Sequence, residues 1–185
     1  MSKIRILIIG LGRIGKIHLA NLQAMDKVEI VGICDPTDEA KAFSNKAGLT
    51  FYQKDFTDVA SEVQTDAIVI CSPTDTHANY VSLAAKKGID VFCEKPLDLS
   101  LKKVKEVLKT VSESKIKLML GFNRRFDSEF QSVKEKIVKG EIGDIHTIKI
   151  TSRDPSPPPI NYIKNSGGMF LDMTIHDFDM IRYLT

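Results

Sequence analysis

The chain has few cysteines, no long apolar run and no excess of either charge. Its three cysteines, Cys34, Cys71 and Cys93, lie far apart, which excludes a disulfide framework and a clustered metal site and favours buried, reduced thiols. The apolar run at 4–9 is far too short for a secretory signal or a membrane span. Because the net charge is only +2, with acids and bases interleaved, we expect no nucleic-acid partner and no anionic membrane partner. We therefore expect a cytoplasmic protein that binds no metal.

Apolar runs alternate with amphipathic stretches along the first two thirds of the chain. Near-continuous apolar strands separated by helices are typical of a parallel sheet that helices cover on both faces. The sequence therefore predicts an α/β fold, a Rossmann-like doubly wound parallel sheet, over residues 1–121. Runs rich in isoleucine and valine predict the strands, at 4–9, 28–34, 66–71, 89–93 and 116–120. The stretches between them predict helices, at 16–25, 76–87 and 100–114, the last capped by Ser100.

The pattern changes after the last of these runs. Residues 127–139 predict a helix that ends at Gly140, and the alternation at 145–153 predicts a half-buried strand. A proline-rich loop follows, and then a helix from about Gly168 to the end. One strand and one helix do not make a domain, because both edges of a lone strand lack partners. We therefore expect 122–185 to be the incomplete start of an α+β substrate and oligomerisation domain, and the chain to be the N-terminal part of a longer protein.

A glycine-rich segment, G-L-G-R-I-G, follows the first predicted strand and opens the first predicted helix. Glycines here permit a tight turn, close approach of a pyrophosphate and close packing of helix against strand, and the start of a helix favours phosphates. Because strand, helix and next strand follow in the expected order, the segment predicts dinucleotide binding rather than a merely structural turn. The residues expected to bind the cofactor are Gly10, Gly12, Arg13, Ile14 and Gly15.

Asp35 ends the second predicted strand, 20 residues after Gly15. A carboxylate at this place can accept both ribose hydroxyls of an adenosine and would repel a 2′-phosphate. No arginine follows it closely. The sequence therefore predicts NAD rather than NADP as the cofactor. The alternative is that Asp35 caps the next helix.

A polar segment follows the run at 66–71, at the same edge of the predicted sheet as the glycine loop. The hydroxyls and backbone of Ser72, Pro73 and Thr74 can line the path of the cofactor's ribose and phosphates. The alternative is that Thr74 or Asp75 simply caps the following helix. His77, in that helix's first turn, is a further cofactor candidate, although a structural role is commoner for such a residue.

The tripeptide Glu94-Lys95-Pro96 directly follows the run at 89–93. It places a lysine at the carboxyl edge of the predicted sheet, where open α/β folds hold their ligands. Taken alone, it is equally compatible with an ordinary transition from strand to loop. We expect Glu94 and Lys95 to contact the cofactor.

Asp172 and His176 are spaced i, i+4 and would share one face of the final predicted helix. An aspartate beside a histidine can fix its tautomer and raise its basicity, as a proton acceptor for an alcohol requires. Gly167-Gly168 upstream lets backbone approach a ligand closely. Taken alone, however, such a pair is more often solvated or structural. Asp177 and Asp179 are expected to be exposed acids of the helix.

Asn123, Arg124 and Arg125 follow the last apolar run at the ligand edge of the predicted sheet. An arginine there can bind a polyol or a carboxylate. The alternative is a structural pair with a nearby acid such as Asp127 or Glu129.

In combination these segments resemble the Gfo/Idh/MocA family of oxidoreductases over essentially the whole chain. The segment at 152–159 is further similar to the inositol 2-dehydrogenase branch of that family. The motifs that carry the family resemblance are Gly10-Leu-Gly-Arg-Ile-Gly15, Glu94-Lys95-Pro96-Leu97, Gly121-Phe-Asn-Arg-Arg-Phe126 and Gly167-Gly-Met-Phe-Leu-Asp172 continuing through His176.

The resemblance implies NAD as cofactor and oxidation of a secondary alcohol on a polyol or sugar ring, with myo-inositol favoured. It implies that His176 takes the hydroxyl proton, that Asp172 orients His176, and that Lys95 hydrogen-bonds the reacting oxygen. It also implies that Asn123 and Arg125 help to hold the ring or the nicotinamide end of the cofactor, so that all five residues belong to the substrate site.

Members of the family are nearly twice as long as this chain, so the resemblance implies further strands that wall the substrate site and bury an oligomer interface. We expect a homo-oligomer at full length, and weak or absent turnover from this chain alone. Two alternatives remain open: a dehydrogenase of another sugar or cyclitol, and a non-catalytic NAD-binding regulatory module. The presence of Lys95, Asp172 and His176 together argues against the regulatory module.

Overall fold

The computed structural model describes residues 2–154, 156–158, 160–163 and 166–185. The chain divides into two compact units, Met1–Leu120 and Gly121–Thr185, and each is described by itself.

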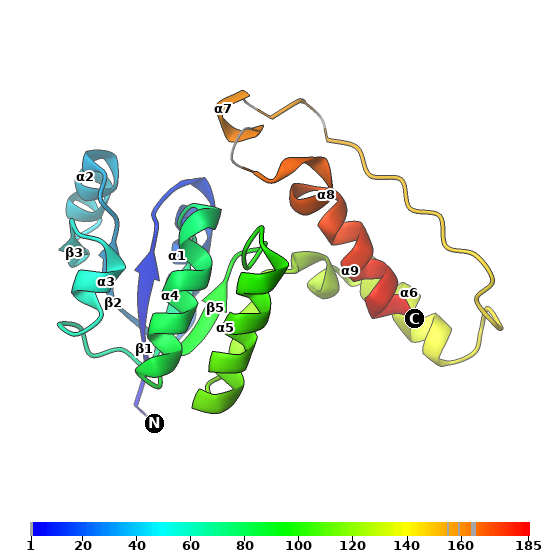
Figure 1. The fold of residues 1–185 in the computed structure, drawn as a ribbon, viewed down its shortest axis with the longest axis horizontal. Helices are drawn as coiled ribbons and strands as arrows, with labels where there is room; N and C mark the ends of the chain where they lie inside the picture. The colour runs from blue at the N-terminus through cyan, green and yellow to red at the C-terminus, as the bar shows by residue number, and fades with distance from the viewer. Residues whose placement is uncertain (1, 155, 159, 164–165) are drawn as a thin grey trace. The chain divides into compact units, whose positions relative to one another are not determined.

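The first unit is built on a six-stranded sheet in the order β3-β2-β1-β4-β5-β6 (Figure 1). Every neighbouring pair of strands is parallel. The chain builds outward from β1 in one direction and then returns to β1 and builds in the other, which creates a topological switch point between β1 and β4. The predicted Rossmann-like α/β fold is thus confirmed. The strands are β1 (Ile4–Ile9), β2 (Val28–Cys34), β3 (Phe51–Tyr52), β4 (Ala67–Ile70), β5 (Asp90–Cys93) and β6 (Leu118–Leu120).

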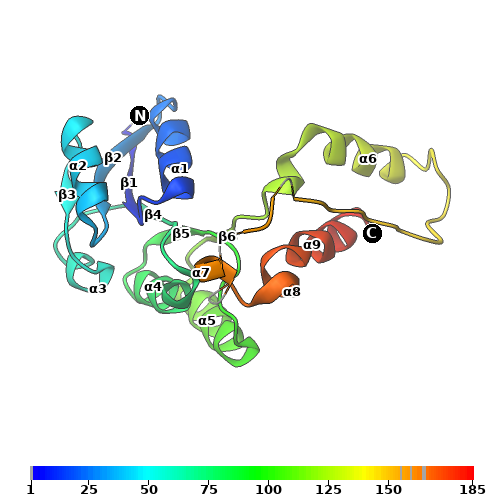
Figure 2. The ribbon, with the colours of Figure 1, turned by 90° about the horizontal axis from the view of Figure 1, so that it is seen from above.

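Helices cover both faces of this sheet, because successive side chains of each strand point to opposite faces. Ile6 and Ile8 of β1 belong to one apolar cluster, which includes Leu19. Leu7 and Ile9 belong to a second cluster, on the other face. Figure 2 shows α1 and α4 on opposite sides of the strands. The helices of this unit are α1 (Arg13–Gln23), α2 (Asp38–Lys46), α3 (Phe56–Val59), α4 (Thr74–Lys86) and α5 (Leu101–Ser114).

The starts of these helices show how local sequence sets their bounds. Thr37 caps α2 by accepting a hydrogen bond from the Ala40 N–H, and Asp55 caps α3. Ser100 occupies the N-cap position of α5, as predicted, but its side chain makes no capping hydrogen bond. Asp98 instead accepts a hydrogen bond from the Ser100 N–H at 2.8 Å.

The second unit contains short helical elements joined by extended chain. Its predicted first helix is confirmed as α6, which begins after Asp127 and is followed by Gly140 at φ +72°. A left-handed glycine just after a helix is a common C-terminal stop. The elements are η1 (Asn123–Phe126), a 3₁₀ helix, followed by α6 (Ser128–Val138), α7 (Ile160–Ile163), α8 (Gly168–Asp172) and α9 (Thr174–Leu184).

The predicted strand at 145–153 is not a strand in the structure. The backbone is extended at 145–154 (Figure 1), and Ile148 and Ile150 are half-buried while Thr147 and Lys149 are exposed, as the alternation indicates. A strand also requires a hydrogen-bonded neighbour, and no described residue of the chain forms a ladder with this segment.

The predicted final helix is divided in two at Met173. This residue has φ −100° and ψ −56°, away from ideal helical values, and the His176 N–H bonds to the Met173 carbonyl only three residues back. Asp172 is therefore the last residue of α8 and His176 the third of α9. The expectation that both lie on one continuous helix was wrong.

Candidate functional site

The glycine loop between β1 and α1 contains two glycines that the protein's own packing requires. Gly10 adopts φ +86°, and a Cβ there would lie 2.6 Å from the Ser72 backbone nitrogen. A Cβ on Gly15 would lie 2.1 Å from the Gly10 carbonyl oxygen. Gly12 differs, because a Cβ there would meet nothing within 4 Å. Packing of the described protein therefore does not require a glycine at position 12, whereas close approach of a ligand would.

Gly12 is also the N-cap of α1, an 11-residue helix. Within the described part of the chain, no side chain makes a capping hydrogen bond there, and the first turn carries no acidic residue. The first N–H groups of a helix and the positive end of its dipole favour anions. The loop therefore fits the pyrophosphate of a dinucleotide.

Asp35 lies just after β2 and is 8% exposed. Its Oδ2 accepts a hydrogen bond from the Leu11 N–H at 2.8 Å, and its Oδ1 accepts from the N–H and hydroxyl of Thr37 at 2.8 and 2.5 Å. Thr37 rather than Asp35 caps α2, so the alternative role for Asp35 was wrong. A carboxylate offers about four acceptor positions, so its protein partners leave capacity for a ligand hydroxyl beside the glycine loop.

Ser72 and Pro73 lie in the connection from β4 to α4, and Thr74 is the first residue of α4. The Ser72 and Thr76 hydroxyls lie 2.6 Å apart, and the Thr76 hydroxyl donates to the Pro73 carbonyl at 2.7 Å. Pro73 is the N-cap of α4, and among the described residues no side chain caps this helix, so neither Thr74 nor Asp75 has the capping role considered as the alternative.

His77 is 2% exposed and lies beneath this connection. Its Nδ1 lies 2.8 Å from the Pro96 carbonyl oxygen, and its Nε2 lies 2.9 Å from the Ser72 carbonyl oxygen. Because both ring nitrogens face protein groups, we do not propose that His77 contacts a cofactor directly.

Glu94 and Lys95 follow β5 at the same edge of the sheet. The Glu94 N–H continues the pairing with β4 by bonding to the Ile70 carbonyl at 2.9 Å. The Glu94 carboxylate lies 2.8 Å from Nε2 of His18 on α1. The next peptide bond, Lys95–Pro96, is cis.

The structure thus gathers the first group of candidates at one edge of the sheet, at the carboxyl ends of β1, β2, β4 and β5. This is the edge at which open α/β sheets bind ligands. Sequence reasoning missed His18, which lies one turn after Gly15 on α1 and contacts Phe92 edge-on, with ring centroids 4.9 Å apart. Its place on the helix that follows the glycine loop was the signal available.

In the second unit, each arginine of η1 pairs with an acid of α9. Arg125 donates from Nε and an Nη to Asp179 at 2.8 and 2.6 Å, and Asp179 is 7% exposed. Arg124 pairs with Asp177, which also accepts a hydrogen bond from Ser152 at 2.6 Å. Asp177 and Asp179 are therefore not exposed helix acids, and that expectation was wrong.

The pKa of Asp177 reflects this environment. Burial raises it, but the hydrogen bonds from Ser152 and Arg124 outweigh burial and hold it below the ordinary value. Arg125 forms a structural pair with an acid, which was the alternative considered for it. The acid is Asp179, however, and not Asp127 or Glu129.

The remaining candidates belong to the same unit. Asn123 is the first residue of η1 and is exposed. Asp172 and His176 are half-buried. The His176 ring meets Phe122 edge-on, with centroids 6.3 Å apart. The second unit thus brings His176 near the start of η1.

Within the described residues, no three histidine, cysteine or acidic side chains gather in a way that could hold a metal ion. No helix in that part of the chain has the length and apolar character needed to cross a membrane.

Comparisons with known proteins agree with the fold. The chain is 46% identical over 182 residues to an inositol 2-dehydrogenase of Rhizobium meliloti, covering 98% of this chain and 54% of the relative. It superposes on a myo-inositol dehydrogenase of Corynebacterium glutamicum with a TM-score of 0.90 at 41% identity, covering 99% of this chain and 55% of that one. It also superposes on a scyllo-inositol dehydrogenase of Lactobacillus casei, solved with NAD(H) and scyllo-inositol, with a TM-score of 0.86 at 30% identity, covering 100% and 56%.

The chain therefore spans about half the length of the relatives it matches. Residues 4–122 match the model of an oxidoreductase family with an NAD-binding Rossmann fold. Residues 130–185 match the C-terminal domain of the same family. The chain belongs to the Gfo/Idh/MocA family of oxidoreductases.

Proposed function

We propose that the protein is an NAD-dependent dehydrogenase that oxidises a secondary alcohol of a cyclic polyol, with myo-inositol as the favoured substrate. The observation that carries the proposal is the glycine loop at the ligand edge of the sheet. There Gly12 leaves open space at the start of α1, with Asp35 held beside the loop by the Leu11 N–H.

Different residues at this edge would bind different parts of the cofactor. The glycine loop and the start of α1 would bind the pyrophosphate, and Asp35 would accept an adenosine ribose hydroxyl. Ser72, Pro73, Glu94 and Lys95 would line the path toward the nicotinamide. When bound, NAD accepts the hydride that leaves the carbinol carbon.

The protein's own residues would handle the proton and the reacting oxygen. His176 accepts the hydroxyl proton, and Asp172 orients the His176 ring for that transfer. Lys95 donates a hydrogen bond to the oxygen as it gains alkoxide character. Because Arg125 is engaged by Asp179, its part in the substrate site is to hold η1, where Asn123 offers an exposed amide to the ring.

The substrate class rests on the relatives. An inositol 2-dehydrogenase is 46% identical to this chain, and a solved scyllo-inositol dehydrogenase with the same fold holds scyllo-inositol. We also infer that the second unit is the start of a substrate domain, since residues 130–185 match the family's C-terminal domain.

The test is reduction of NAD by the full-length protein, followed by the absorbance of reduced nicotinamide, with myo-inositol, scyllo-inositol and glucose as parallel substrates. The matched variants are Lys95→Ala and Lys102→Ala, since Lys102 is an exposed residue of α5. We expect activity with myo-inositol in the parent and in Lys102→Ala. In Lys95→Ala we expect a loss on the order of 100-fold, the usual effect of removing one hydrogen bond to a developing oxyanion.

Two results would contradict the proposal. NAD binding without reduction in the presence of any of the three substrates would exclude the dehydrogenase activity. Equal activity of Lys95→Ala and Lys102→Ala would exclude the role given to Lys95.

A further inference from the structure

His77 connects the two segments that follow β4 and β5. One ring nitrogen lies 2.8 Å from the Pro96 carbonyl oxygen, and the other lies 2.9 Å from the Ser72 carbonyl oxygen. Only 2% of the residue is exposed, so water does not compete freely for these contacts. The buried ring of His77 therefore lies between two backbone carbonyl oxygens.

A carbonyl oxygen accepts hydrogen bonds and cannot donate them, whereas a neutral imidazole carries only one N–H. A neutral ring can therefore donate to only one of the two carbonyls. The contact with the Pro96 carbonyl is buried, whereas the contact with the Ser72 carbonyl is only partly buried, so a missing hydrogen bond costs more at Pro96. The geometry therefore favours the tautomer with the proton on Nδ1.

The two contacts fix the segment that contains Lys95. Pro96 directly follows Lys95, and its carbonyl is held from α4 by His77. Glu94 directly precedes Lys95, and its carboxylate is held from α1 by His18 at 2.8 Å. The segment 94–96 is thus held on both sides of the lysine by histidines that come from two different helices.

We propose that His77 is a positioning residue for Lys95. Its Nδ1–H donates to the Pro96 carbonyl while the ring lies against the Ser72 carbonyl, so His77 ties the β4–α4 connection to the segment 94–96 and sets where the lysine lies. His18 completes the arrangement through Glu94. This role rests on the proposed function, because the role of Lys95 does.

Two conservative variants separate the two contacts. The amide nitrogen of asparagine lies as many bonds from Cα as Nδ1 of histidine, so His77→Asn keeps a donor for Pro96. The amide nitrogen of glutamine corresponds in the same way to Nε2, so His77→Gln keeps a donor for Ser72 and loses the one for Pro96. His146→Gln is the matched control, since His146 is exposed in the second unit.

The experiment is nuclear magnetic resonance on the ¹⁵N-labelled protein at neutral pH. We expect Nδ1 of His77 to show the signature of a protonated ring nitrogen. We expect the backbone signals of Glu94 and Lys95 to shift and broaden in His77→Gln, and to stay close to the parent in His77→Asn and His146→Gln. In turnover, His77→Gln should lower kcat while leaving the KM for NAD nearly unchanged.

An Nδ1 without a proton in the parent would overturn the proposal, and this measurement needs no variant to fold. Identical Lys95 signals in His77→Asn and His77→Gln would also overturn it. Neither reading depends on cofactor or activity. A protonated Nδ1 in a protein that fails to bind NAD would therefore contradict the proposed function and leave the contact between His77 and Pro96 established.

Discussion

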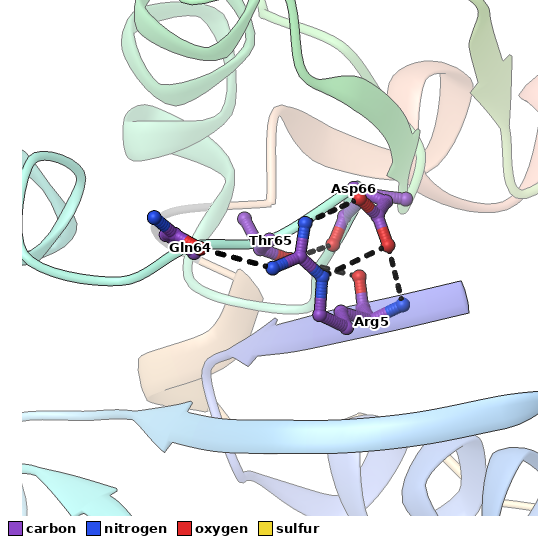
Figure 3. A network of polar contacts seen from close by, with 5 residues as sticks. Arg5, Gln64, Thr65 and Asp66 are labelled. Atoms are coloured by element: carbon purple, nitrogen blue, oxygen red, sulfur yellow. Dashed lines mark hydrogen bonds and ion pairs between the residues drawn. The ribbon is translucent and has the colours of Figure 1, made fainter. Parts of the chain in front are cut away.

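At the scale of single residues, the pairing of Arg5 with Asp66 ties the start of β1 to the segment before β4 (Figure 3). Asp66 accepts hydrogen bonds from the Arg5 N–H, Nε and an Nη, at 2.8, 3.2 and 2.8 Å, and Gln64 accepts one from the same guanidinium at 3.2 Å. These hydrogen bonds lower the pKa of Asp66 from 3.8 to about 2.

The lowered pKa of Asp66 makes a prediction about acid unfolding. A carboxyl whose pKa is depressed by folding contributes stability above its unfolded pKa, and this contribution is lost as the pH falls through its folded pKa. The contribution of Asp66 should therefore disappear between about pH 4 and pH 2. Asp66→Asn should flatten the dependence of the free energy of unfolding on pH in this window, as measured by urea titrations at several pH values.

Asp26→Asn is the control, because Asp26 is an exposed residue of the turn before β2. It should keep the parent's pH dependence. If Asp66→Asn also kept the parent's slope, the Arg5 contact would not persist in solution.

At the scale of elements, two charged pairs join η1 to α9. The acid of the Arg125–Asp179 pair is the more buried of the two acids, since the Asp179 side chain is 7% exposed and the Arg125 side chain 41%. Asp179→Asn removes the charge and weakens both hydrogen bonds. Because the guanidinium is partly solvated, we expect the free energy of unfolding to fall by about 1–2 kcal/mol, less than for a fully buried pair. Thermal or urea unfolding measures this change.

The exposed pair Lys136–Glu141, with side-chain exposures of 57% and 46%, supplies the comparison. Lys136→Gln should change stability by no more than about 0.5 kcal/mol, because exposed pairs contribute little. Equal effects of Lys136→Gln and Asp179→Asn would show that the Arg125 pair does not hold α9 to η1.

The elements also show what sequence pattern can predict and what it cannot. Five of the six strands and the helices α1, α4, α5 and α6 follow from apolar runs and capping residues, because these signals are local. The strand β3 has two residues, Phe51–Tyr52, which is too short for a periodic pattern. The segment 145–153 has the alternation of a strand, but its state depends on a neighbour, which no local pattern reveals.

The candidate site likewise contains features that the sequence predicts and features that it does not. The glycine loop and Asp35 were predictable because their spacing along one strand and helix carries the signal. The pairs of Arg124 and Arg125 were not, since their partners lie 53 and 54 residues away. Asp179 was expected to be an exposed acid of the helix, and no local pattern indicates that Arg125 pairs with it.

At the scale of the whole molecule, the two units carry different parts of the proposed chemistry. Met1–Leu120 holds the cofactor candidates on a parallel sheet, and Gly121–Thr185 holds Asp172 and His176 on α8 and α9. The account of function depends first on the cofactor, because the roles given to Lys95 and His176 have no meaning without a hydride acceptor.

The most direct test is a calorimetric titration of the parent and of Gly12→Ala with NAD and NADH. A Cβ at position 12 meets no protein atom within 4 Å, so Gly12→Ala should unfold within about 1 kcal/mol of the parent, the usual scale for glycine-to-alanine changes. The account predicts saturable binding to the parent and at least about tenfold weaker binding to Gly12→Ala, since the added methyl group would occupy the approach of the pyrophosphate. Failure of the parent to bind, or equal binding by the folded variant, would contradict it.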